Sequence, residues 1–126
     1  MRVLIADDQK SVGVTLAEMV TRCGHEVVEV VASGLDAIHG YTRHRPDIVL
    51  MDYSMPRLNG ATACKMILAK DPKARIILVS GAIPVSDIAD SGAVAILSKP
   101  LGLERLYSAL YDASNVAADS AKPPSA

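Results

Sequence analysis

Five residues of types that can carry out chemistry together stand at separate places in the chain: Asp7, Asp8, Asp52, Ser80 and Lys99. Three carboxylates brought together repel one another unless a cation lies among them. Their hard oxygen ligands, with no His or Cys nearby, favour magnesium, with manganese as an alternative. A lysine ammonium can pair with a phosphoryl oxygen, and a serine hydroxyl can donate a hydrogen bond to another. The set therefore predicts phosphoryl transfer to a carboxylate nucleophile beside a metal ion.

The elements that must position these residues are short apolar runs alternating with helical patterns. The runs predict strands at residues 2–7, 26–32, 47–52, 75–80 and 94–97, and the helical patterns cover 11–23, 33–43, a stretch up to Lys70 and a last helix from Leu103. Ser33 is the expected cap of the second helix, with Leu35 facing inward. Strands separated by helices pair in parallel. We therefore expect an α/β fold with a doubly wound five-stranded parallel sheet.

Carboxyl ends of parallel strands share one edge of the sheet, where open α/β sheets bind their ligands. The five polar residues end or follow four of the expected strands. Each has an ordinary explanation when taken alone: Asp8 can cap a helix, Ser80 and Gly81 can form a turn, and Lys99 can be a solvated lysine. Their joint position at the ends of different strands favours a single site.

Composition restricts the function further. The 126 residues suit one domain, which we place at 1–116, with a flexible C-terminal tail at 117–126. The 13 basic and 14 acidic residues nearly cancel, and no basic cluster appears, so we expect no direct nucleic-acid binding. No apolar run approaches the roughly 20 residues of a membrane helix, so we expect no membrane insertion and a cytoplasmic location. Cys23 and Cys64 have no ligand-like spacing and are expected to be reduced thiols.

These residues resemble the receiver domain of response regulators in two-component signal transduction, of the CheY-like type. The resemblance rests on Asp7-Asp8, on Asp52 in Val-Leu-Met-Asp-Tyr-Ser-Met-Pro-Arg-Leu-Asn-Gly, on Ser80-Gly81-Ala82 and on Lys99-Pro100, which appear in this order. It implies a flavodoxin-like (βα)5 fold with strand order 2-1-3-4-5. It also implies a cis bond between Lys99 and Pro100.

The resemblance further implies a role for each site residue. Asp52 is the phosphoacceptor, Ser80 the switch hydroxyl and Lys99 the ion-pair partner of the phosphoryl group. Asp7, Asp8, Asp52 and the backbone carbonyl of Ser54 hold the metal. The phosphoryl group comes from a histidine kinase or a histidine phosphotransfer protein, and the signal passes to a downstream protein target. The chain is then a signalling domain rather than an enzyme, although it can catalyse its own phosphotransfer and autodephosphorylation.

The sequence departs from the family pattern at two places. Ile96 stands three residues before the lysine, where the family often has Tyr or Phe. The stretch from Ser80 to Lys99 is shorter than usual in the family, and its segment from Gly81 to Gly92 is poor in helix formers, so we expect a short or distorted helix there. With no ring at Ile96, we expect activation to act mainly by moving this segment.

Two other functional classes compete with the signalling hypothesis. A phosphatase of the haloacid-dehalogenase type also uses an aspartate nucleophile and magnesium, but that family has a second Asp two residues later, where this chain has Ser54. A flavin-binding domain of similar architecture would need a hydroxyl-rich phosphate loop, where this chain has Asp7-Asp8-Gln9-Lys10. Turnover of small phosphate esters would identify the phosphatase, and an absorbance spectrum would identify a flavin.

Overall fold

The structure, a computed structural model, describes residues 1–81 and 90–121. Within these residues a parallel sheet forms in the order β2-β1-β3-β4-β5, which confirms the expected strand order. The strands are β1 (Arg2–Ala6), β2 (Glu26–Val31), β3 (Ile48–Asp52), β4 (Ile76–Ser80) and β5 (Ala95–Ser98).

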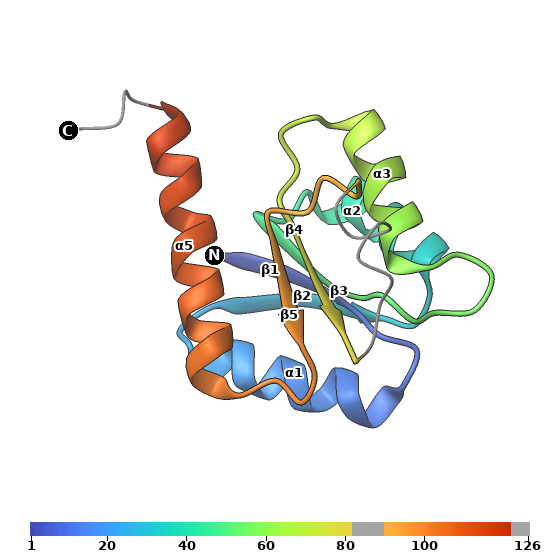
Figure 1. The fold of residues 1–126 in the computed structure, drawn as a ribbon, viewed down its shortest axis with the longest axis horizontal. Helices are drawn as coiled ribbons and strands as arrows, with labels where there is room; N and C mark the ends of the chain where they lie inside the picture. Colours follow the sequence, from blue (N-terminus) through green and yellow to red (C-terminus); the bar gives the residue numbers. More distant parts are fainter. Residues whose placement is uncertain (82–89, 122–126) are drawn as a thin grey trace.

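Helices cover both faces of the sheet. They are α1 (Lys10–Arg22), α2 (Gly34–His44), α3 (Gly60–Lys70) and α5 (Leu103–Ala121). Figure 1 shows α1 and α5 on one face and α2 and α3 on the other. The helix expected between Gly81 and Gly92 falls largely on residues 82–89, which lie outside the described residues, so that expectation stays a prediction.

The middle of the sheet is buried on both faces. All five residues of β3 and all five of β4 are buried, as the two helical layers require of central parallel strands. One half of the core joins Leu4, Val49 and Leu78 to α2 and α3, and the other joins Ile5, Leu50 and Ile77 to α1 and α5. The central strand ends are therefore held by packing on two sides.

Side-chain caps begin two of the helices. The Ser33 hydroxyl accepts a hydrogen bond from the Asp36 N–H, as expected, and the Asn59 side chain accepts one from the Thr62 N–H. The inward orientation expected for Leu35 is wrong, because 54% of Leu35 is exposed. The buried side of α2 is formed by residues at helical spacing from Gly34 and Ile38, and Leu35 lies about a third of a turn from it.

The last helix is longer than the sequence pattern indicated. Residues 117–121, which we expected in a flexible tail, continue α5 as far as Ala121. The flexibility of residues 117–126 stays a prediction. Alanine has the highest helix propensity, and the segment carries Ala117, Ala118 and Ala121. Figure 1 shows this end of α5 extending past the sheet. The remaining residues, 122–126, lie outside the described part of the chain.

Candidate functional site

The sheet register brings the predicted site residues to one level. Ala6 pairs with Met51, Asp52 with Val79, and Ser80 with Ser98. The residues that follow, Asp7 after β1 and Lys99 after β5, therefore emerge at the same edge as Asp52 and Ser80. The convergence expected from the strand ends is confirmed for these four residues.

Three carboxylates form a cluster at this edge. Asp7, Asp8 and Asp52 each place one carboxylate oxygen within 4.8 Å of the others. Asp7 is 2% exposed and Asp52 is 4% exposed, whereas Asp8 is exposed to solvent. Two of the three negative charges are therefore out of water, where their repulsion is weakly screened.

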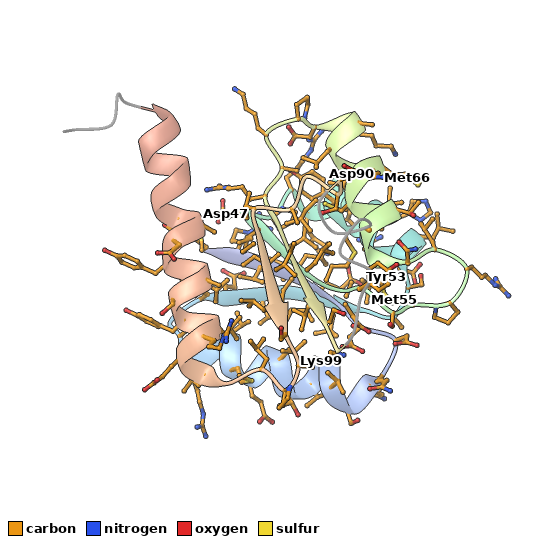
Figure 2. All side chains as sticks on the ribbon, in the orientation of Figure 1. Asp47, Tyr53, Met55, Met66, Asp90 and Lys99 are labelled. Atoms are coloured by element: carbon orange, nitrogen blue, oxygen red, sulfur yellow. The ribbon has the colours of Figure 1, made fainter. Side chains whose placement is uncertain are left out.

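Lys99 is the cation that faces the buried pair. Its Nζ lies 3.1 Å from Oδ1 of Asp52 and 3.6 Å from Oδ2 of Asp7. Figure 2 shows Lys99 just beyond the end of β5, beside α1. The peptide bond that joins it to Pro100 is cis, as the resemblance implied. One ammonium against three carboxylates leaves the cluster negative, so a further cation would be stabilised there.

The protonation of Asp52 reflects this imbalance. Burial raises the pKa of Asp52 above its ordinary value, and the Asp7 carboxylate adds to the increase. The hydrogen bond and charge of Lys99 act in the opposite direction, as does a hydrogen bond from the Ser54 N–H. The ionised form of Asp52 is thus incompletely compensated by the protein.

Two buried polar atoms at the cluster have no hydrogen-bond partner among the described residues, namely Oδ2 of Asp7 and Oγ of Ser80. The other oxygen of Asp7 accepts a hydrogen bond from the Gln9 N–H at 2.8 Å. Buried polar atoms are normally paired, and exceptions call for an unbound ion or ligand or for a functional role. A carboxylate oxygen suits a hard cation and a hydroxyl suits a phosphoryl oxygen, so the donor set fits both.

The loop after β3 lies closely against Asp52. Figure 2 shows Tyr53 and Met55 in this loop, and Ser54 stands between them. The Gly60 N–H donates to the Tyr53 carbonyl at 2.8 Å, and a Cβ on Gly60 would clash with the Asp52 carbonyl oxygen. In the sequence, Gly60 stands out only as the last residue of the motif around Asp52. Its role in this close approach depends on a neighbour that the residue type does not reveal.

Ile96 does not point into the core. It is 42% exposed on β5, and the next residue, Leu97, is 6% exposed. The position that often carries an aromatic ring in the resembled family therefore presents a branched aliphatic side chain to solvent.

Comparisons with known proteins agree with this geometry. The profile of the response regulator receiver domain matches residues 3–111. The chain is 36% identical over 116 residues to the chemotaxis protein CheY of Thermotoga maritima, covering 90% of this chain and 97% of that protein. It is 35% identical over 121 residues to a protein-glutamate methylesterase/protein-glutamine glutaminase of Archaeoglobus fulgidus, covering 93% of this chain but only 33% of that protein.

A solved structure gives the same picture in three dimensions. The CheX–CheY–BeF3–Mg2+ complex of Borrelia burgdorferi contains a chain that matches with a TM-score of 0.83 and 29% identity, covering 89% of this chain and 87% of that one. Among the described residues, no helix is long and apolar enough to span a membrane. The profile match spans most of the sequence, and the chain belongs to the response regulator receiver domain family of two-component signal transduction.

Proposed function

We propose that Asp52 accepts a phosphoryl group from the phosphohistidine of a histidine kinase or a histidine phosphotransfer protein. Asp7, Asp8, Asp52 and the backbone carbonyl of Ser54 would hold Mg2+ beside it. The observation that carries the proposal is the carboxylate cluster, in which Asp7 and Asp52 are buried and the Lys99 ammonium lies 3.1 Å from Asp52. In the CheY complex of known structure Mg2+ and BeF3 are present, which favours Mg2+ over Mn2+ as the metal.

The chemical step uses the groups on this edge of the sheet. A carboxylate oxygen of Asp52 attacks the phosphorus atom, the bond from phosphorus to the donor nitrogen breaks, and an acyl phosphate forms on Asp52. Lys99 pairs with one phosphoryl oxygen, and the unpartnered Ser80 hydroxyl donates a hydrogen bond to another. Bound Mg2+ would neutralise charge on the phosphoryl oxygens. Attack by water then returns Asp52 and releases inorganic phosphate.

The phosphorylated chain would act on a downstream protein. The relative from Borrelia burgdorferi is found in a complex with CheX, and the methylesterase relative is an enzyme of which this chain spans a third. We propose that this chain signals through protein contacts and has no substrate beyond its own acyl phosphate. A cytoplasmic location stays a prediction. The comparisons do not support the haloacid-dehalogenase hypothesis.

Phosphorylation with a labelled donor tests the proposal. Wild-type protein with Mg2+ and radiolabelled acetyl phosphate should gain label that is stable in acid and lost in base. Asp52→Asn should gain none. Asp47→Asn is the matched control, because Asp47 is an exposed aspartate at the opposite end of the sheet from Lys99 (Figure 2), and it should label as the wild type does. Label that persists in Asp52→Asn would place the acceptor elsewhere.

A further inference from the structure

The first residue of α2 lies directly against the loop between β3 and α3. A Cβ on Gly34 would lie 2.8 Å from the carbonyl oxygen of Leu58, 3.1 Å from its Cδ2 and 3.2 Å from its Cβ. The nearest of these atoms belongs to the backbone, which cannot rotate away as the end of a side chain can. The beginning of α2 therefore sets how closely this loop can approach.

The same loop is fixed on both sides of Leu58. The Leu58 N–H donates to the Pro56 carbonyl at 2.7 Å across Arg57, whose φ of 69° is that of a strained turn. Two residues later, Gly60 packs on the Asp52 backbone and bonds the Tyr53 carbonyl. The backbone of a loop fixed at these points has little freedom to move. A displacement of Leu58 would therefore also displace Ser54.

We propose that Gly34 is a positioning residue for the metal site, although it belongs to a different helix and contacts none of the proposed ligands. Its missing side chain lets the loop pack against α2, and the packed loop places the Ser54 carbonyl and the Asp52 carboxylate. This inference rests on the proposed function, because it assumes that Asp52 and Ser54 help to hold Mg2+.

Gly34→Ala should displace the loop rather than the helix. The Ser33 hydroxyl caps α2 through the Asp36 N–H, and buried Ala37 and Ile38 hold the helix on the sheet. The loop is packed less completely, since Leu58 and Tyr53 are only partly buried. Residues that orient metal ligands typically change metal affinity by about 10- to 100-fold when they are replaced, so we expect Mg2+ binding to weaken about tenfold.

The same helix offers a matched control. The atoms nearest to a Cβ on Gly40 would be the two ends of the Leu4 side chain, at 3.3 and 3.4 Å, and a carboxylate oxygen of Glu29 at 3.8 Å. Gly40→Ala thus makes the same substitution in α2 without touching the loop. It controls for changes in helix propensity and in overall stability.

The experiment is a titration with Mg2+ alone, followed by backbone NMR of the full chain in three forms: wild type, Gly34→Ala and Gly40→Ala. Gly34→Ala should bind Mg2+ about tenfold more weakly. Its amide signals from Ser54 to Leu58 should shift before any metal is added. Gly40→Ala should bind as the wild type does. Equal Mg2+ affinity of Gly34→Ala and the wild type would overturn the inference.

A second variant keeps the test decisive if Gly34→Ala does not fold. Leu58→Ala removes the side chain that anchors the loop on α2, at a partly buried position whose loss the fold can tolerate. It should also weaken Mg2+ binding, and unchanged affinity would overturn the inference. A wild-type protein that binds no Mg2+ would instead overturn the proposed function together with this inference.

Discussion

Asp52→Asn should make the metal-free protein more stable at neutral pH, although it removes an ion pair. The Asp52 carboxylate is 4% exposed, and its oxygen lies at most 4.8 Å from one of Asp7. At an effective dielectric constant of about 20, that repulsion costs about 3.5 kcal/mol, and the attraction to Lys99 at 3.1 Å returns about 5 kcal/mol. Desolvation of the carboxylate costs several kcal/mol more.

Lys99 would still have an ion-pair partner after the substitution. It keeps Asp7 at 3.6 Å, so the usual penalty for orphaning a buried charge does not apply. Burying the Asn amide offsets part of the gain. We expect the free energy of unfolding to rise by about 1 kcal/mol, a typical size for a single substitution. The raised pKa of Asp52 supports this sign, because it means that the protein compensates the charged form incompletely.

The pH dependence of the unfolding free energy follows from the raised pKa of Asp52. Because the folded state raises the pKa of Asp52, it holds that proton more tightly than the unfolded chain does. The wild type therefore gains stability relative to Asp52→Asn as the pH falls from neutral through the folded pKa of Asp52, and the greater stability of the variant should disappear in acid. Mg2+ should abolish the greater stability of the variant at neutral pH as well, since a ligand at ten times its Kd stabilises the wild type by about 1.4 kcal/mol.

The assay is urea unfolding followed by circular dichroism, with EDTA, at neutral and at acidic pH. Asp47→Asn is the control; it replaces the carboxylate that accepts from the Arg2 N–H at 2.7 Å with a neutral amide oxygen and should be slightly less stable at neutral pH. A metal-free Asp52→Asn less stable than the wild type at neutral pH would refute the reasoning, because Lys99 would then outweigh repulsion and desolvation together.

Four further predictions concern single features of the molecule. Ser80→Ala should leave the unfolding free energy nearly unchanged, because the buried hydroxyl has no hydrogen-bond partner within residues 1–81 and 90–121. It should nevertheless reduce the NMR shifts caused by beryllofluoride, and a large loss of stability would contradict this prediction. Arg57→Gly should raise the unfolding free energy by about 1 kcal/mol, measured in urea, because an exposed L-residue is held at φ 69°. Ile96→Tyr should label with acetyl phosphate as the wild type does, because Ile96 is 42% exposed and outside the carboxylate cluster. Truncation after Val116 should leave folding and labelling intact, and loss of either would show that the last turn of α5 is needed.

The C-terminal helix shows a limit of prediction from composition. The small and polar residues from Ala117 onward gave no sign of a helix, but α5 continues to Ala121, while the flexibility of these residues stays a prediction. Composition indicates only an average preference for ordered or disordered structure. A helix that is already formed on the sheet can extend into an alanine-rich segment at little cost in free energy, because the unfavourable nucleation step has been completed. The predicted inward orientation of Leu35 was wrong for a related reason. A helical pattern is compatible with several apolar faces, and the position of the sheet decides which face is buried.

The pattern of residue types along the chain was sufficient to predict the parallel sheet and the edge at which its polar residues meet. Strand ends can be read from local pattern, and parallel pairing sends every carboxyl end to the same side, so Asp7, Asp52, Ser80 and Lys99 could be placed together without coordinates. The packing of distant segments is needed to show that Lys99 reaches both buried carboxylates. The same holds for the absence of a hydrogen-bond partner for Oγ of Ser80 among the described residues, and for the position of Gly34 and Gly60 directly against the loop beside Asp52. Those facts depend on distances between residues far apart in the chain. Such distances are set by how the helices pack on the sheet, and no residue type encodes them locally.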